Sequence, residues 1–160
     1  VVGYFTNLFP NDPPKFIIME AQAADCLYRG ALAGDGAPRI VDGDLQTIMA
    51  GLACGEPNTI SWDILRNHVT AFVSCPDWVT ARGMRTLGAP EKGDPRVISG
   101  ESGAVTTGLV ETLMLDPEYA ELKELIGLDK TSSVLCFSTE GDTDPDQYRR
   151  IVWEGEYPTC

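Results

Sequence analysis

Apolar residues occur along this chain in short clusters, separated by polar, glycine-rich or proline-rich turns. Residues 16–20, 71–74 and 133–137 are rich in β-branched or aromatic side chains, which is typical of buried strands. The apolar pair at 97–98 follows a turn-rich segment and indicates one more short β-like run. Between these runs the apolar residues recur at helical spacing. The pattern predicts helices over residues 1–9, 23–33, 61–68, 76–87, 102–115, 117–126 and 145–153.

Capping residues and apolar faces predict where several of these helices begin and how they are oriented. Ser61 is a favourable N-cap, and we expect Trp62 and Leu65 of its helix to face inward. Asp144 followed by Pro145 is a combination that often opens a helix. For the helix at 23–33 the expected apolar face consists of Cys26, Leu27 and Leu32.

Strands that alternate with helices of ten or more residues predict an α/β fold, with a largely parallel sheet and helices on both of its faces. The chain has 160 residues, of which 43% are apolar, and this is enough for one globular domain with a core. No internal repeat or low-complexity segment is visible. Residues 1–4 resemble the middle of a helix and no Met precedes them, so we expect a piece of a longer protein.

The formal net charge is −12 at pH 7, with 24 acidic and 12 basic side chains. Such a charge disfavours binding to nucleic acid or to an anionic membrane surface. No apolar run approaches the length of a membrane span, and no signal peptide opens the chain. These features predict a cytoplasmic protein with neither nucleic acid nor membrane as a partner.

Five cysteines are present, and none of them forms a C-x-x-C pair, so a structural zinc site is not expected and no metal is predicted. Their odd number, in a composition typical of the cytosol, favours reduced and mostly buried thiols. They are Cys26, Cys54, Cys75, Cys136 and Cys160.

Three glycine-containing stretches, at residues 50–58, 99–105 and 138–144, lie between predicted elements. Their glycines would allow the backbone to approach a flat or anionic ligand closely. Taken singly, each stretch also has an ordinary structural interpretation. Glu101 is favourable at the start of any helix, and residues 138–144 form a normal loop from a strand to a capped helix.

Together the three stretches, in this order and at this spacing, resemble the carboxyl-terminal part of fold-type II pyridoxal-phosphate (PLP) enzymes. Within that group they resemble the diaminopropionate ammonia-lyases, to which the combination of MAGLACGEPN, SGESGAV and STEGDTD is specific. The resemblance covers nearly the whole chain. Its longest segments are residues 20–29, 43–65, 94–105 and 138–155.

The resemblance implies a cofactor-binding role for several residues. Ser138 corresponds to a position where the family holds a hydroxyl against the pyridine nitrogen of PLP, and Thr139 is the alternative one position later. Glu101 resembles a carboxylate that lies beside the cofactor ring. Gly51 and Leu52 resemble a segment whose backbone borders that ring.

The resemblance also implies that residues 1–160 are the carboxyl-terminal part of the larger, cofactor-binding domain. The family's Schiff-base lysine lies in an Asn-x-Phe-Lys type of context, and its phosphate loop is rich in glycine, and neither pattern occurs here. The catalytic aspartates of the family are absent as well, so no catalytic residue is assigned to this chain. Its lysines are better explained as solvated charges: Lys15, Lys92, Lys123 and Lys130.

The activity implied by the resemblance is PLP-dependent α,β-elimination of 2,3-diaminopropionate to pyruvate and ammonia, a step of amino-acid catabolism in a homodimeric enzyme. The resemblance implies that this chain alone is inactive. One alternative is a threonine or serine dehydratase of the same fold, although the resemblance to those enzymes implies a shorter loop in place of STEGDTD. The other alternative is a non-catalytic α/β binding domain, which the missing lysine favours and the three cofactor-edge stretches oppose.

Cys26 and Cys54 follow motifs that the family brings to the rim of its active site, so their side chains are expected to lie close together. A disulfide between them would close a loop of 27 residues and, by chain entropy, stabilise the fold by roughly 3–4 kcal/mol. The reducing cytosol argues for free thiols instead. We expect their α-carbons within roughly 7 Å, whether or not the bond forms.

Overall fold

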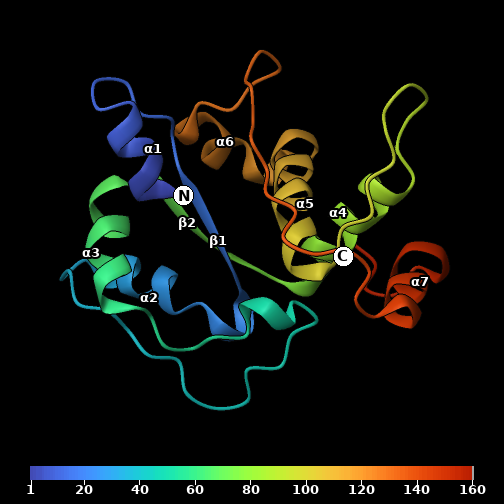
Figure 1. The fold of residues 1–160 in the computed structure, drawn as a ribbon, viewed down its shortest axis with the longest axis horizontal. Helices are drawn as coiled ribbons and strands as arrows, with labels where there is room; N and C mark the ends of the chain where they lie inside the picture. Colours follow the sequence, from blue (N-terminus) through green and yellow to red (C-terminus); the bar gives the residue numbers. More distant parts are fainter. Residues whose placement is uncertain (160) are drawn as a thin grey trace. The chain divides into compact units, whose positions relative to one another are not determined.

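The computed structural model describes residues 1–159, and the chain divides into two compact units. The first unit consists of Val1–Gln46 and Leu52–Ser74, and the second of Thr47–Gly51 and Cys75–Cys160. The helices and strands are shown along the chain in Figure 1. They are α1 (Val2–Leu8), β1 (Ile17–Ala21), the 3₁₀ turn η1 (Gln22–Ala24), α2 (Cys26–Ala33), η2 (Ala50–Leu52), α3 (Thr59–His68), β2 (Ala71–Cys75), α4 (Asp77–Gly88), α5 (Glu101–Leu115), η3 (Pro117–Tyr119), α6 (Ala120–Ile126) and α7 (Pro145–Glu154).

The first unit contains a two-stranded parallel sheet, in which β1 pairs with β2. The pairing begins just before both strands, where the amide of Thr70 donates to the carbonyl of Phe16 at 2.9 Å. Phe16 and Ala21 are buried. Helices α2 and α3 lie between the two strands in sequence. These two predicted strands and the α/β class are confirmed.

Trp62 on α3 is buried, as predicted, and its indole nitrogen donates to the carbonyl of Gly36 at 2.9 Å. Gly30 on α2 makes room for it, because a Cβ there would come within 2.9 Å of the indole. Two details of the prediction are wrong. Asn58, not Ser61, caps α3 by accepting from the amide of Ser61. Leu32 is exposed, because Gly30 occupies the buried face of α2 instead.

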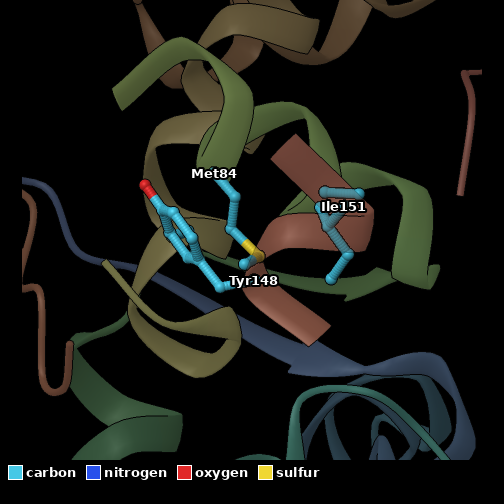
Figure 2. Close-up of a cluster of buried hydrophobic side chains, with 5 residues drawn as sticks. Met84, Tyr148 and Ile151 are labelled. Atoms are coloured by element: carbon cyan, nitrogen blue, oxygen red, sulfur yellow. The ribbon is translucent and has the colours of Figure 1, made fainter. Parts of the chain in front are cut away.

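In the second unit α4 packs directly against α5, and Figure 1 shows the two side by side. Gly83 and Gly108 allow this close approach, since a Cβ on either would collide with the main chain of the other helix. Helix α7 joins them through an apolar cluster, part of which is shown in Figure 2. The buried members of the cluster are Ala81, Met84, Ala104, Tyr148 and Ile151.

Residues 133–137 and 97–98 are not strands, so the prediction is wrong for both segments. Val134, Leu135 and Phe137 are exposed rather than buried. A strand is maintained by hydrogen bonds to a neighbouring strand, and among residues 1–159 the sheet consists of β1 and β2 alone. A suitable apolar composition does not form a strand without such a partner.

Within the described part of the chain, no helix is long and apolar enough to cross a bilayer.

Candidate functional site

Glu101 is the first residue of α5, where a negative charge is favourable because of the helix dipole. Its side chain is buried, with 8% of the residue exposed. The carbonyl of Glu101 accepts a hydrogen bond from the hydroxyl of Thr80 on α4. Its carboxylate oxygen Oε1 accepts a hydrogen bond from the side-chain amide of Gln147 at 3.0 Å. Glu101 is therefore bound to α4 by its backbone and to α7 by its side chain.

The loop before α7 lies directly against the start of α5. The amide of Gly100 donates to the carbonyl of Glu140 at 3.0 Å, and the amide of Ser102 donates to the Glu140 carboxylate at 2.9 Å. Gly100, the N-cap residue, has no side chain that could perform this capping role. A Cβ on Gly100 would lie 2.6 Å from Cγ of Glu140, so the glycine is needed for the close approach. Glu140 thus caps a helix that begins 39 residues earlier in the sequence.

Ser138 lies at the same helix start. Its hydroxyl is 2.9 Å from the hydroxyl of the fully buried Ser99 and 3.3 Å from the carbonyl of Glu140. A Cβ on Gly103 would come within 2.9 Å of the amide of Thr139 and 3.0 Å of the α-carbon of Ser138. Gly103 therefore provides the space that lets the loop backbone lie on α5. Ser138 itself is exposed, so it can take a further partner.

The third glycine-containing stretch reaches this place through Gly51, whose amide donates to the hydroxyl of Ser102 at 3.0 Å. All three predicted stretches therefore contribute to one group of polar residues, which we call the α5 start cluster. Leu52, the residue after Gly51 in η2, is counted with the first unit and is half-buried. The α5 start cluster consists of Gly51, Ser99, Glu101, Ser102, Ser138 and Glu140.

Ser138 and Thr139, the two alternatives for the hydroxyl that is expected to face the cofactor, differ in their contacts. The hydroxyl of Ser138 has two hydrogen-bond partners, whereas no hydrogen bond is formed by the Thr139 hydroxyl within residues 1–159. Thr139 is exposed and contributes its backbone to the contact with Gly103. Ser138 is therefore the better fixed of the two side chains.

Sequence reasoning missed the residues that hold the predicted ones in place. Ser99, Ser102 and Glu140 lie inside the motifs quoted above, but no pattern showed that they bond across stretches. Gln147 was missed as well. The signal that could have found it is its position three residues after the cap Asp144, because a glutamine there often has a capping role.

Of the two alternatives for Cys26 and Cys54, the structure has free thiols, and no disulfide joins them. The segments do lie close together, since the sulfur of Cys26 is 3.6 Å from the carbonyl oxygen of Cys54. Each thiol has another acceptor: the Glu20 carboxylate for Cys26 and the carbonyl of Glu56 for Cys54, both at 3.5 Å. Burial, together with the negative charge of Glu20, raises the pKa of Cys26 to about 12.

The remaining cysteines agree only in part with the prediction. Cys75 and Cys136 are free, but Cys136 is exposed, as is Cys54, so the expectation of mostly buried thiols is met by half of the described cysteines. Cys160 lies outside the described residues.

By its fold the chain is an α/β protein, and the solved structures that it resembles include an enzyme in complex with a PLP intermediate. A crystal structure of Escherichia coli diaminopropionate ammonia lyase with D-serine matches all of this chain and 39% of that one, with 44% identity and a TM-score of 0.87. A second structure of the E. coli enzyme, in complex with an aminoacrylate-PLP azomethine reaction intermediate, matches 88% of this chain and 35% of that one. Its identity is 51% and its TM-score 0.77.

The particular proteins that the chain is similar to are thus diaminopropionate ammonia-lyases. The curated enzyme of Escherichia coli strain K12 is 50% identical over 157 residues, which are 98% of this chain. The same residues make up only 39% of that enzyme, so the chain spans about two fifths of the length of the relatives it matches. No family model matches the chain.

Proposed function

We propose that this chain is the carboxyl-terminal part of the large domain of a PLP-dependent ammonia-lyase, and that this enzyme converts 2,3-diaminopropionate to pyruvate and ammonia. The observation that carries the proposal is the meeting of all three predicted stretches at the start of α5. Similarity over 98% of the chain to enzymes of this name supports it. Because of this similarity, a threonine or serine dehydratase and a non-catalytic domain are the weaker hypotheses.

The α5 start cluster fits one side of a flat, polar cofactor. Ser138 offers an exposed hydroxyl that two neighbours hold in place. At the same helix start, Gly51 contacts Ser102 and Gly100 contacts the loop at Glu140, and neither glycine adds a side chain. Lysine is absent from the cluster, so the covalent anchor and the phosphate loop are expected from the rest of the enzyme. The chain would therefore supply one wall of the site.

PLP, when bound, supplies the electron sink that makes the α-proton of an amino acid easier to remove. Ser138 would hydrogen-bond the pyridine nitrogen as a neutral partner, with Thr139 as the alternative. A hydroxyl cannot protonate this nitrogen as a carboxylic acid would, and this suits elimination better than transamination. Glu101 would place a carboxylate beside the ring. The backbone of Gly51 and Leu52 would border the ring and exclude water from that side.

The finer properties of the enzyme belong to the same proposal. We propose a homodimer in the cytoplasm, with the small amino acid as its partner and neither nucleic acid nor membrane. The charge of −12 supports the last two points, because it repels polyanions. Light scattering of the purified full-length enzyme would measure the assembly, and a monomer would contradict the proposal.

The test compares Ser138→Ala with Thr139→Ala in the full-length enzyme. Ser138→Ala should weaken PLP binding and slow elimination by about 1–3 kcal/mol, because the pyridine nitrogen of bound PLP would lose its hydrogen-bond partner. Thr139→Ala should stay close to the parent enzyme. PLP affinity is measured by absorbance titration of the apoenzyme, and turnover is measured with diaminopropionate, threonine and serine in parallel.

The outcomes separate the hypotheses. If Thr139→Ala alone weakens PLP binding, the hydroxyl role belongs to Thr139. Faster turnover of threonine or serine than of diaminopropionate would favour a dehydratase. An enzyme without any PLP absorbance would leave the non-catalytic binding domain as the explanation.

A further inference from the structure

Gln147 is the sole hydrogen-bond donor to the Glu101 carboxylate within residues 1–159. No arginine, lysine or histidine of the described chain forms an ion pair with Glu101. A buried carboxylate requires hydrogen bonds to offset its lost hydration. A neutral amide fulfils that need without forming an ion pair, so the Glu101 side chain can still take a charged or polar partner from outside residues 1–159.

Glu101 does not act as a cap for its own helix. The amide of Ser102, one of the first free donors of α5, is taken by the carboxylate of Glu140. The side chain of Glu101 bonds instead to another helix, α7. A capping carboxylate is held by main-chain groups, whereas the orientation of the Glu101 carboxylate depends on one side chain.

Gln147 in turn is held in a fixed place. Its backbone amide donates to the cap residue Asp144 at 3.0 Å. In a common capping arrangement the side chain of a glutamine at this position would bond back to the cap residue's amide. Here it reaches α5 instead. Tyr148 and Ile151, which follow Gln147 on α7, are buried in a cluster with Met84 of α4 and hold α7 in place (Figure 2).

We propose that Gln147 is a positioning residue for Glu101: its amide sets which way the Glu101 carboxylate faces at the start of α5. This inference rests on the proposed function, in which Glu101 lies beside PLP. It goes further by assigning to α7 a role in tuning the cofactor's surroundings. Helix α7 thus does more than cover the α4–α5 pair.

The test uses the full-length holoenzyme and four variants: Gln147→Met, Glu101→Gln, the double variant and the swap Gln147→Glu with Glu101→Gln. Methionine has nearly the length of glutamine and favours helix, but it cannot donate. The measurements are the absorbance maximum of bound PLP, the PLP affinity of the apoenzyme and the thermal unfolding midpoint. Gln147→Met and Glu101→Gln should each shift the absorbance and weaken PLP binding about tenfold, as expected for a lost bond to a charged group.

If Gln147 acts through Glu101, the double variant should be no worse than Glu101→Gln alone, because the two residues form one unit. The swap restores a hydrogen bond between α5 and α7 but moves the carboxylate to α7. It should therefore recover the unfolding midpoint and leave the PLP spectrum altered. If the bond between Glu101 and Gln147 were purely structural, the swap would recover both, and this result would overturn the inference.

Asp144→Ala serves as the matched control. It removes the acceptor of the Gln147 backbone amide but leaves the bond from the Gln147 side chain to Glu101, so it should lower the unfolding midpoint without shifting the PLP spectrum. If it shifts the spectrum as Gln147→Met does, fraying of α7 explains the effect and the inference is wrong. If Glu101→Gln alters spectrum and affinity but Gln147→Met does not, this inference fails while the proposed role of Glu101 stands. If neither variant changes them, the proposed role of Glu101 fails too.

Discussion

Glu20 in the first unit and Glu101 in the second are equally buried, each with 8% of the residue exposed, and each lies beside the start of a helix. The Glu20 carboxylate accepts hydrogen bonds from the amides of Leu27 and Tyr28, at 3.0 and 2.7 Å, and from the thiol of Cys26. It therefore caps α2. Within residues 1–159 the Glu101 carboxylate accepts one hydrogen bond, from the side chain of Gln147.

The difference shows that burial at a helix start does not by itself indicate what a carboxylate does. Glu20 has a structural role at the start of α2. The side chain of the N-cap residue Asp25 forms no capping hydrogen bond, so the amides of Leu27 and Tyr28 depend on the Glu20 carboxylate. In α5 the capping role is taken by Glu140, and this leaves Glu101 free for another purpose. The hydrogen-bond partners of the two carboxylates, rather than their positions, distinguish a structural acid from a candidate functional one.

The largest effect that separates the two acids should come from Glu20→Ala. Two main-chain donors at the start of α2 lose their acceptor, and we expect a loss of about 2–4 kcal/mol in the free energy of unfolding. PLP affinity of the folded full-length enzyme should not change. Hydrogen exchange at the amides of Leu27 and Tyr28 measures the local loss. Exchange as slow as in the parent enzyme would show that Glu20 is not the cap.

Glu140→Ala should have a smaller effect on stability, about 1–2 kcal/mol, since it removes one capping bond from α5. It should also weaken PLP binding, because Glu140 holds the loop that carries Ser138 against α5. Glu140→Gln keeps an acceptor for the amide of Ser102 and serves as the control. Equal PLP affinity of Glu140→Ala and the parent enzyme would contradict a link between the cap and the cofactor wall.

The pH dependence of stability gives a third way to test the role of Glu20. Burial raises the pKa of Glu20 above its ordinary value of 4.5, although its hydrogen bonds act in the opposite direction. The folded state therefore binds the proton more tightly than the unfolded state. The stability of the parent protein, relative to Glu20→Gln, should fall as the pH rises from about 4.5 through the raised pKa. Parallel curves for the two proteins, from denaturant unfolding at several pH values, would contradict the shift.

The smallest expected effect concerns the thiol beside Glu20. Burial is the main reason why the pKa of Cys26 is raised to about 12, and the charge of Glu20 adds to it. Cys54 and Cys136 are exposed and should react first with an alkylating reagent near neutral pH, followed only slowly by Cys26 and Cys75. In Glu20→Gln the labelling of Cys26 should be slightly faster, as measured by mass spectrometry. Rapid labelling of Cys26 in the parent protein would contradict its buried, protonated state.

Two apolar runs of similar composition show how far the fold could be predicted. Residues 16–20 and 133–137 both have the pattern of a buried strand. The first became β1, within one residue of the expected bounds, because β2 pairs with it. The second has no pairing partner in the described chain and lies exposed. Strand formation depends on pairing with a segment that is distant in the sequence. The composition of a run does not show whether such a pairing partner is present.

The sequence by itself determined the features that depend on near neighbours. Asp144 and Pro145 open α7 as expected, because a cap acts on an amide three residues away. The motifs also identify the stretches that contain Gly51, Glu101 and Ser138 as candidate parts of a site.

Only the tertiary structure decided which groups meet across those stretches. It placed Glu140, and not a neighbouring residue, on the amide of Ser102, and it brought Gln147 to Glu101 across 46 residues. Neither bond has a local pattern, because each depends on how closely α5 approaches α4, α7 and the loop before α7. Glycines at positions 83, 100, 103 and 108 allow these close approaches. The packing of whole helices, rather than any single motif, therefore determines which polar groups form hydrogen bonds with each other.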